Sequence, residues 1–218
     1  MLFMTVEITP PEFESTNLKI SDAELVAAGI ENFDLWNVPH GMALPEDLAR
    51  ALRVMHIRDF TLRALMPDSS HKFNHVEEAT RFTTSPKHRR EAYVLTAQDQ
   101  VAKETNLAAF GWFRPLLDPR VQGDYEDYDL VAALVQRSKD PGVYVTAAIE
   151  VFAGYRQQLA AASLIEASLE HFSEKHPELQ GVCVRVGTPR AINMVEHTDF
   201  ARLTSEEGGG GIFVRELR

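Results

Sequence analysis

The junction between a strand-like segment and an alanine-rich segment offers the most informative chemistry in this sequence. Residues 143–152 read as a long apolar strand, and residues 156–175 carry apolar side chains at helical spacing. The first turn of a helix leaves backbone N–H groups without intrahelical partners and carries a partial positive charge, so an anion can bind there. Arg156 adds a fixed positive charge, and the small residues 160–162 would let a ligand approach closely. The same residues also fit an ordinary turn between a strand and a helix.

Two acidic features of the sequence are candidates for deprotonating an amine or for attracting a cationic one. Glu150, near the end of the strand, is the best-placed carboxylate for a general base. Because side chains alternate along a strand, Glu150 and Val151 face opposite sides of the sheet. The acidic run at residues 124–129 could close over the site and attract a cation. Both features have a simpler interpretation, as a surface or ion-paired glutamate and as a solvated loop.

Composition limits the classes of function. The chain has 218 residues, of which 44% are hydrophobic and 25% charged, as expected for a soluble protein with one domain and an extension, or two small domains. A formal net charge of −10 argues against a nucleic-acid partner, because phosphate binding needs a basic surface. The single cysteine, Cys183, is expected to be a buried structural thiol. Without a signal peptide or an apolar stretch long enough for a membrane span, we expect a cytoplasmic protein with no membrane partner.

Periodicity and turn residues predict the elements that must position the junction. Residues 1–54 are predicted to form an N-terminal helical extension, with one helix from Ser21 toward Trp36 and another from Pro45. Residues 55–218 are predicted to form a separate domain. Its expected strands cover residues 60–66, 92–97, 107–113, 143–152, 182–186 and 211–215, and its expected helices cover residues 71–82, 130–137, 156–175 and 190–197. This order predicts an α/β fold in which helices cover both faces of a mixed sheet.

The segment after the long strand resembles the coenzyme A element of the GNAT acyltransferases. Residues 155–161 read Tyr-Arg-Gln-Gln-Leu-Ala-Ala and lead into an alanine-rich helix. The family element reads Arg or Gln, two residues, Gly, one residue, and then Gly or Ala. Arg156 and Ala161 match its two ends, whereas Leu159 stands where Gly is usual.

A second segment, residues 188–200, is similar to a late helix of the same family. That helix usually begins Asn-x-x-Ala, and Gly-Phe follows after seven more residues. Ala191 and Phe200 match, whereas Thr188 replaces Asn and Asp199 replaces Gly. The two segments occur in the family's order, and the resemblance covers about residues 55–218.

The resemblance implies an N-acyltransferase with a mixed, mostly antiparallel central sheet flanked by helices. It would move an acetyl or similar acyl group from acetyl-CoA directly to a primary amine of a small molecule or peptide, and it would need no metal. The backbone around Ile149 and Val151 would pair with pantetheine, and the N–H of Val151 would stabilise the oxyanion. The N–H groups that would bind the diphosphate belong to Arg156, Gln157, Gln158, Leu159, Ala160, Ala161 and Ala162.

One family residue is missing. A tyrosine of the late helix usually protonates the departing thiolate, and Val195 occupies its position in this sequence. A non-catalytic acyl-CoA-binding protein with a regulatory or interaction role is therefore an alternative. A third hypothesis is a structural protein in which residues 1–54 serve as a docking or dimerisation arm, so a homodimer is one candidate assembly.

Overall fold

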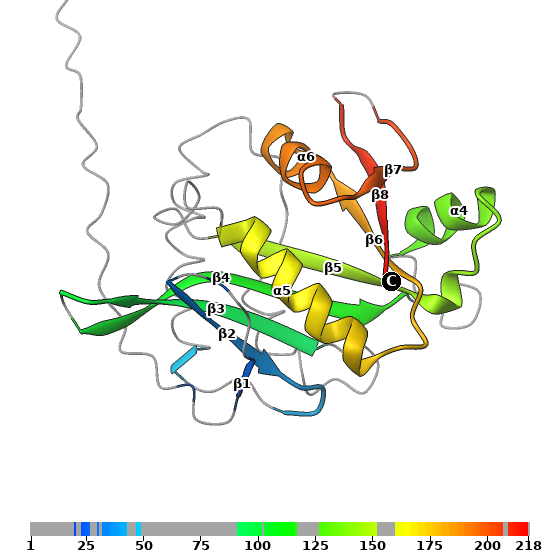
Figure 1. Cartoon of the computed structure of the whole chain (residues 1–218). Coiled ribbons are helices and arrows are strands. Elements are labelled where there is room, and N and C mark those ends of the chain that lie inside the picture. Colours follow the sequence, from blue (N-terminus) through cyan, green and yellow to red (C-terminus); the bar gives the residue numbers. More distant parts are fainter. Residues whose placement is uncertain are drawn as a thin grey trace, which may run out of the picture.

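One mixed sheet organises the described part of the chain (Figure 1). The computed structural model describes residues 20, 23–26, 30, 32–42, 47–48, 91–101, 103–116, 127–151, 160–206 and 209–217. Within these ranges the strand order is β1-β2-β3-β4-β5-β6-β8-β7, and β5–β6 is the parallel pair in an otherwise antiparallel sheet. The strands are β1 (Glu24–Val26), β2 (Phe33–Val38), β3 (Glu91–Asp99), β4 (Glu104–Pro115), β5 (Tyr144–Val151), β6 (Gly181–Val186), β7 (Ala201–Arg202) and β8 (Gly211–Glu216). The helices are α4 (Tyr128–Gln136), the short 3-10 helix η1 (Pro141–Val143), α5 (Ala160–Lys175) and α6 (Pro189–Glu196).

The elements predicted after residue 90 are confirmed wherever the structure describes them, with bounds shifted by a few residues. The short strand β7 has no counterpart among the predicted elements. Asp47 and Leu48 are helical, in agreement with the helix predicted from Pro45. The rest of that helix, the strand and helix predicted over residues 60–82, and the division of the chain at residue 54 lie outside the described residues.

The helix predicted from Ser21 toward Trp36 is wrong where the structure describes it, because this segment contains β1 and β2. β2 pairs antiparallel with β3 along its whole length. Its Leu35 packs in the core on one face of the sheet, while Trp36 and Val38 pack on the other face. Because both faces of β2 are covered, its sequence lacks the alternation of apolar and polar residues that marks a half-buried strand.

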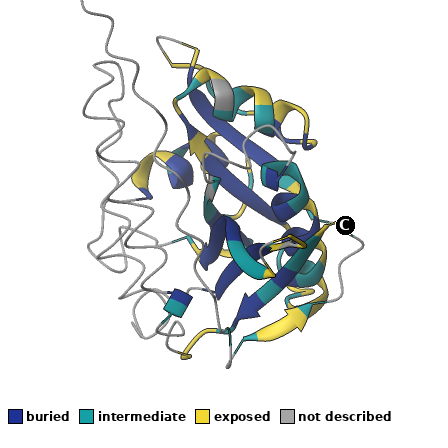
Figure 2. Cartoon of the chain, turned by 90° about the vertical axis from the view of Figure 1, so that its left-hand side faces the viewer, coloured by how far each residue is buried: buried dark blue, intermediate teal, exposed yellow. Residues whose placement is uncertain are grey.

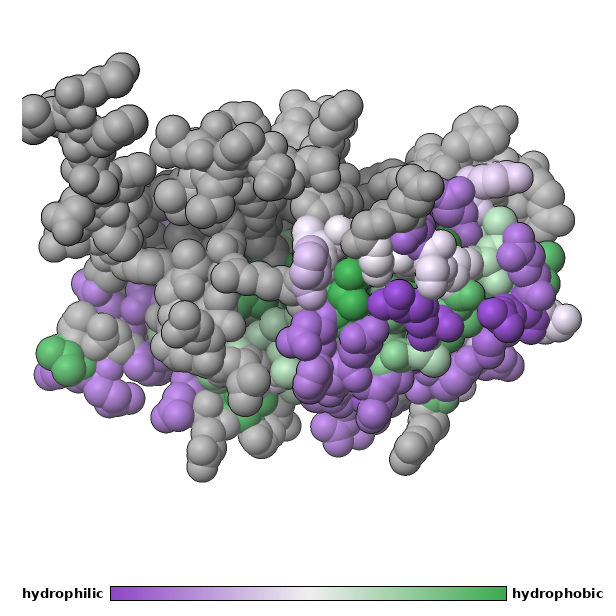
Figure 3. Space-filling view, turned by 90° about the horizontal axis from the view of Figure 1, so that it is seen from above, coloured by the Kyte–Doolittle hydropathy of each residue, from purple (hydrophilic) through white to green (hydrophobic). Residues whose placement is uncertain are grey.

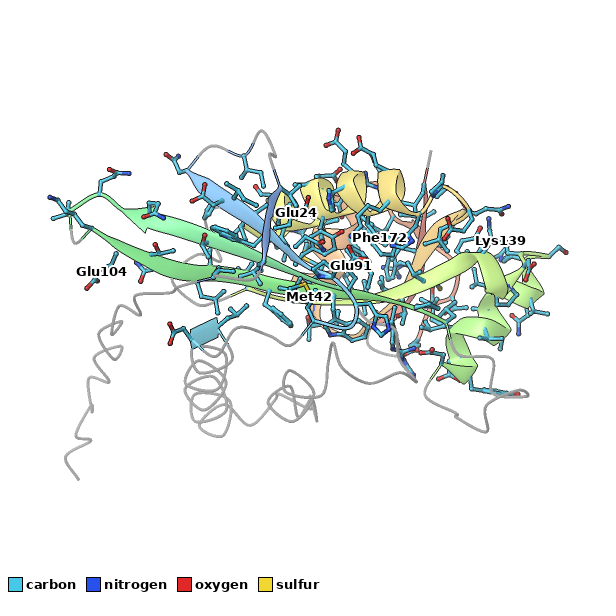
Figure 4. All side chains as sticks on the ribbon, turned by 90° about the horizontal axis from the view of Figure 1, so that it is seen from below. Glu24, Met42, Glu91, Glu104, Lys139 and Phe172 are labelled. Carbon is cyan, nitrogen blue, oxygen red and sulfur yellow. The ribbon has the colours of Figure 1, made fainter. Side chains whose placement is uncertain are left out.

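Helices cover both faces of the sheet. α5 and α6 pack on one face through the largest core cluster, and α4 packs on the other face against β5, β6 and β8 (Figures 1 and 4). The buried apolar side chains of α5 are Ala160, Leu164, Ile165, Ala167, Leu169 and Phe172. Burial of a side chain such as that of Phe172 contributes about 1.5–3 kcal/mol.

The distribution of exposure follows from these layers. Figure 2 shows central strands that are mostly buried, with stretches of intermediate exposure, and helices whose outer faces are exposed. Seen from above, the described surface is largely hydrophilic with smaller hydrophobic patches (Figure 3). None of the described helices is long and apolar enough to cross a membrane.

β4 contains a β-bulge, a point where it has one residue more than its partner β3, and this bulge lies close to the end of β5. Leu95 pairs with Ala109 but Thr96 pairs with Leu107, so Ala108 has no partner position in β3. As a result Ala108 and Ala109 both lie in the core beneath α5, while Leu107 lies on the opposite face. A bulge of this kind bends the strand and increases its twist. The bend therefore lies where β5 ends, with Val151 opposite Ala109.

Candidate functional site

The sheet opens between β5 and β6. Tyr144 pairs with Gly181 and Val145 with Val182, and no further pair joins these two strands within the described residues. β5 continues along β4 as far as Val151, whereas β6 continues along β8. The two parallel strands therefore form a V that opens toward their C-terminal ends, and Figure 1 shows β6 turning away from β5.

The backbone of β5 presents every second residue to this V. The carbonyl of Val143 accepts a hydrogen bond from the N–H of Gln180 on the β6 side, at 2.8 Å. The carbonyl of Tyr144 accepts from the N–H of Leu116 on the β4 side, at 3.3 Å. Because backbone groups alternate along a strand, those of Ala147, Ile149 and Val151 face the V. An extended ligand lying in the V could pair with this edge as an added strand does.

The end of β5 and the start of α5 meet in one core. Ile149 and Val151 pack against the cluster that contains Ala160, the first described residue of α5. The side chain of Ala160 is fully buried, whereas Ala161 and Ala162 are half-buried. The other predicted anion-binding residues, Arg156, Gln157, Gln158 and Leu159, lie outside the described residues. The structure thus brings together the described parts of the predicted site, from β5 and from the first turn of α5.

The predicted general base occupies the strand position between Ile149 and Val151. Glu150 is opposite Phe110 of β4, and its side chain is outside the described part of the structure. Strand alternation assigns position 150 to the face of the sheet that carries Trp112 and Ala148, which is the face opposite α5.

The late helix is well formed although two family residues are replaced. The hydroxyl oxygen of Thr188 accepts a hydrogen bond from the N–H of Ala191 at 3.2 Å, and Pro189 occupies the first turn. Thr188 therefore caps α6, a role for which threonine and asparagine are both suited. Val195 is only 2% exposed and packs with Phe200 in the core shared with α5. This position supplies no hydroxyl and is turned into the core.

The described end of the acidic run is engaged in ion pairs. Asp127, at the start of α4, forms a bidentate pair with Arg114 of β4 in which Nη2 lies 2.8 Å from Oδ1, and both side chains are 2% exposed. Asp129 pairs with Arg185 at 2.8 Å. The carboxylate of Asp127 is therefore neutralised by a buried arginine, which disfavours a role for it in attracting an amine, whereas Asp129 is exposed and shares Arg185 with Glu206. The earlier residues of the run lie outside the described residues.

A buried glutamate ties the C-terminal end of α5 to the sheet. Glu91 accepts hydrogen bonds from the side chains of Asn37 (2.8 Å), Tyr93 (3.2 Å) and Lys175 (2.7 Å), and His176 lies 3.3 Å away. Figure 4 shows Glu91 on the α5 side of the sheet, near Phe172. Burial alone would raise the pKa of Glu91, but the bonds from Lys175 and His176 and the charge of Lys175 lower the pKa below its ordinary value. We call these five residues the Glu91 cluster.

The cysteine has the structural role that the sequence predicts. Cys183 is fully buried in β6, and burial, together with the nearby charge of Asp127, raises the pKa of its thiol to about 12. The described residues contain no group of three histidine, cysteine, aspartate or glutamate side chains placed to hold a metal ion.

Comparison with known proteins shows similarity at the level of structure. No family model and no curated protein matches the sequence. The chain is similar to RimL, a ribosomal L7/L12 alpha-N-protein acetyltransferase, with a TM-score of 0.55 and 11% identity over 89% of this chain and 95% of that chain. RimL in complex with coenzyme A gives a TM-score of 0.54 and 10% identity over 89% of this chain and 98% of that chain.

An acetyltransferase from Salmonella typhimurium that modifies the N-terminal serine of the 50S ribosomal subunit protein L7/L12 is also similar. It gives a TM-score of 0.52 and 11% identity over 87% of this chain and 97% of that chain. At these identities the similarity concerns the fold. The chain therefore has the mixed, mostly antiparallel fold of the GNAT acyl-CoA N-acyltransferases, and the resemblance found in its sequence is confirmed at that level.

Proposed function

We propose that this chain is an N-acyltransferase that moves an acetyl or similar acyl group from coenzyme A to a primary amine. The observation that carries the proposal is the V between β5 and β6, with the backbone of Ala147 and Ile149 facing it. Pantetheine is an extended chain with two amide groups, so it can pair with such an edge. The solved structures with the same fold include protein N-acetyltransferases, one of them in complex with coenzyme A.

The diphosphate of coenzyme A would bind at the start of the helix that follows β5. Backbone N–H groups of residues 156–162 would donate to its oxygens, and the guanidinium of Arg156 would add a charge-assisted bond. Ala161 and Ala162 are half-buried, and their small side chains would let a ligand approach the helix closely. Leu159 retains the N–H of the glycine that it replaces, so it would still donate to the diphosphate.

The reaction would be a direct transfer. The amine nitrogen attacks the thioester carbonyl carbon, the C–N bond forms, the C–S bond breaks, and the amine loses a proton while the thiolate gains one. Glu150 would accept the amine proton, and the N–H of Val151 would stabilise the oxyanion. Since Val195 is apolar and buried, we propose that the departing thiolate takes its proton from water, and that the proton held by Glu150 returns to the solvent, which restores the carboxylate and the water.

Binding of coenzyme A to the full chain tests the first half of the proposal. Isothermal titration should detect saturable binding of coenzyme A, and Arg156→Ala should weaken it about ten-fold, equivalent to about 1.4 kcal/mol. Arg137→Ala removes an equal charge from the exposed end of α4 and serves as the matched control. A wild-type chain that binds neither coenzyme A nor acetyl-CoA would exclude the proposal.

Release of free thiol from acetyl-CoA with a panel of amines and peptides tests the second half. Glu150→Gln should lower kcat by about 10²–10⁴-fold, because general-base assistance is lost. Its affinity for coenzyme A should be unchanged. Glu170→Gln, an exposed glutamate of α5, is the control. Equal rates for the two variants would remove Glu150 from the mechanism.

A second function is favoured by one observation. The position of the family's tyrosine acid is filled by Val195, which packs in the core. A chain that keeps the coenzyme site without catalysis would bind acyl-CoA as a regulatory or interaction protein. Tight binding of acetyl-CoA without thiol release, for every amine tested, would favour this function over acyl transfer.

A further inference from the structure

The closed end of the V is held together by little backbone pairing. Tyr144 and Val145 are the residues of β5 that pair with β6, and one further hydrogen bond joins Gln180 to Val143. By contrast, β4 pairs with β5 over seven positions and β6 pairs with β8 over six. Backbone pairing alone therefore gives a weak constraint on the angle between β5 and β6.

A close side-chain contact reinforces this end. The ring of Tyr144 lies directly against Gly181, so that a Cβ at position 181 would overlap the ring and would lie 2.8 Å from the carbonyl oxygen of Arg215. Glycine is thus required at the first residue of β6 if Tyr144 is to keep its place. Tyr144 itself is almost fully buried, in the core between α4 and the sheet.

The hydroxyl of Tyr144 reaches past β6 to β8. It donates to the carboxylate of Glu216, with oxygen–oxygen distances of 2.9 and 3.2 Å. It also accepts a hydrogen bond from Nζ of Lys139 at 3.2 Å, and Lys139 in turn pairs with Glu216. The Lys139 ammonium lies 5.7 Å from the centre of the Tyr144 ring. One side chain of β5 is therefore fixed to β8, and β6 is enclosed between them.

We infer that Lys139, Tyr144, Gly181 and Glu216 form an apex clamp that sets the angle of the V, and that Tyr144 is a positioning residue for acyl-CoA. The role in acyl-CoA binding rests on the proposed function. Ile149 lies four residues beyond Val145, which is a distance of about 13 Å along a strand. A small rotation at the clamp therefore displaces the backbone that would pair with pantetheine.

Removal of one hydroxyl gives the matched test. Tyr144→Phe keeps the ring but loses the bonds to Glu216 and Lys139. Tyr93→Phe removes a buried hydroxyl that also bonds to a glutamate, on the opposite face of the sheet, which α5 covers. We expect Tyr144→Phe to raise the Kd and KM for coenzyme A and acetyl-CoA by about three- to ten-fold, which is the size of the net contribution of a single hydrogen bond, with kcat nearly unchanged. Tyr93→Phe should leave both constants at the wild-type value. Equal effects of the two substitutions would overturn the positioning role.

A glycine substitution extends the test to the ring contact. Gly181→Ala should weaken coenzyme A binding more than Tyr144→Phe does, because the added methyl group forces the ring and the strands apart. Gly142→Ala is the control, since its Cβ would meet only the flexible end of Asp140, at 3.3 Å. Coenzyme A affinity that is the same in both glycine variants would contradict the clamp.

Amide hydrogen exchange tests the clamp without any ligand, so that its failure can be told apart from failure of the proposed function. Tyr144→Phe should speed exchange in β6 and in the first half of β5, and Tyr93→Phe should not. If the wild-type chain binds no coenzyme A, the acyl-CoA role fails, and the exchange data still decide whether the clamp holds the two strands. Unchanged exchange in both strands would overturn the clamp itself.

Discussion

Two clusters of tyrosine, glutamate and lysine hold this fold, and they differ in burial. In the Glu91 cluster the glutamate side chain is 7% exposed and joins the end of α5 to β2 and β3. In the apex clamp the Glu216 side chain is 51% exposed and joins β8 to Tyr144. The comparison shows that similar residue types can supply stability at one place and geometry at another, because burial decides how much each bond contributes.

Desolvation explains the difference. A buried carboxylate has lost its water and depends on donors from the protein, so each bond to Glu91 offsets part of a large penalty. Glu216 can exchange its partners for water at little cost, since it lies at the surface. The clamp therefore restricts the direction of Tyr144 more than it stabilises the folded state.

The largest expected effect is on the free energy of unfolding. Glu91→Gln should lower it by about 2–3 kcal/mol, because the uncharged amide cannot replace the charge-assisted bonds to Lys175 and His176. Glu216→Gln should lower it by less than about 1 kcal/mol, as for exposed ion pairs. Urea unfolding followed by circular dichroism measures both. If the two substitutions cost the same, burial is not what separates the clusters.

The second expected effect concerns pH. The folded-state pKa of Glu91 is lower than its ordinary value of 4.5, so its ionised form is favoured by folding. Its contribution is therefore complete above pH 4.5 and is lost as the pH falls through the folded-state pKa. The stability difference between wild type and Glu91→Gln should be constant near pH 6 and should shrink in acid. A difference that grows below pH 4.5 would reverse the sign of this linkage.

The smallest expected effect concerns salt. At 1 M ionic strength the Debye length is about 3 Å, so the exposed pair of Lys139 and Glu216 should be screened, whereas the buried bonds to Glu91 should persist. Double-mutant cycles in low and high salt measure each coupling separately. We expect the Lys139–Glu216 coupling to fall toward zero and the Lys175–Glu91 coupling to keep most of its value. Equal salt sensitivity would show that the Glu91 cluster is hydrated.

The sequence predicted the fold where local pattern is sufficient. α5 has a wide apolar face, and β3, β4 and β6 are apolar runs bounded by turn residues, so their types could be read directly. The prediction failed for β1 and β2, since Ser21 and Glu24 imitate a helix start and β2 is covered on both faces. A strand of this kind is stabilised by its neighbour β3, which lies more than fifty residues away in the chain.

The candidate site was predictable only in part. A strand end followed by an alanine-rich helix pointed to the residues from Arg156 to Ala162, and the resemblance to the GNAT element added Ile149 and Val151. In the structure Ile149, Val151 and Ala160 pack in one core. The acidic run was a weaker guide, because Asp127 has a buried arginine partner that no spacing in the sequence reveals. Nor does any local pattern show that β5 and β6 separate after Val145.

By itself the sequence determined most of the strands and helices after residue 90, and it predicted an anion site at a helix start beside an arginine. These features depend on side-chain periodicity and on neighbours a few residues apart. Only the tertiary structure decided the angle of the V, the packing of Tyr144 against Gly181 and the hydrogen bond from Tyr144 to Glu216. These contacts join residues that are far apart in the chain, so they exist only once the strands are paired in register.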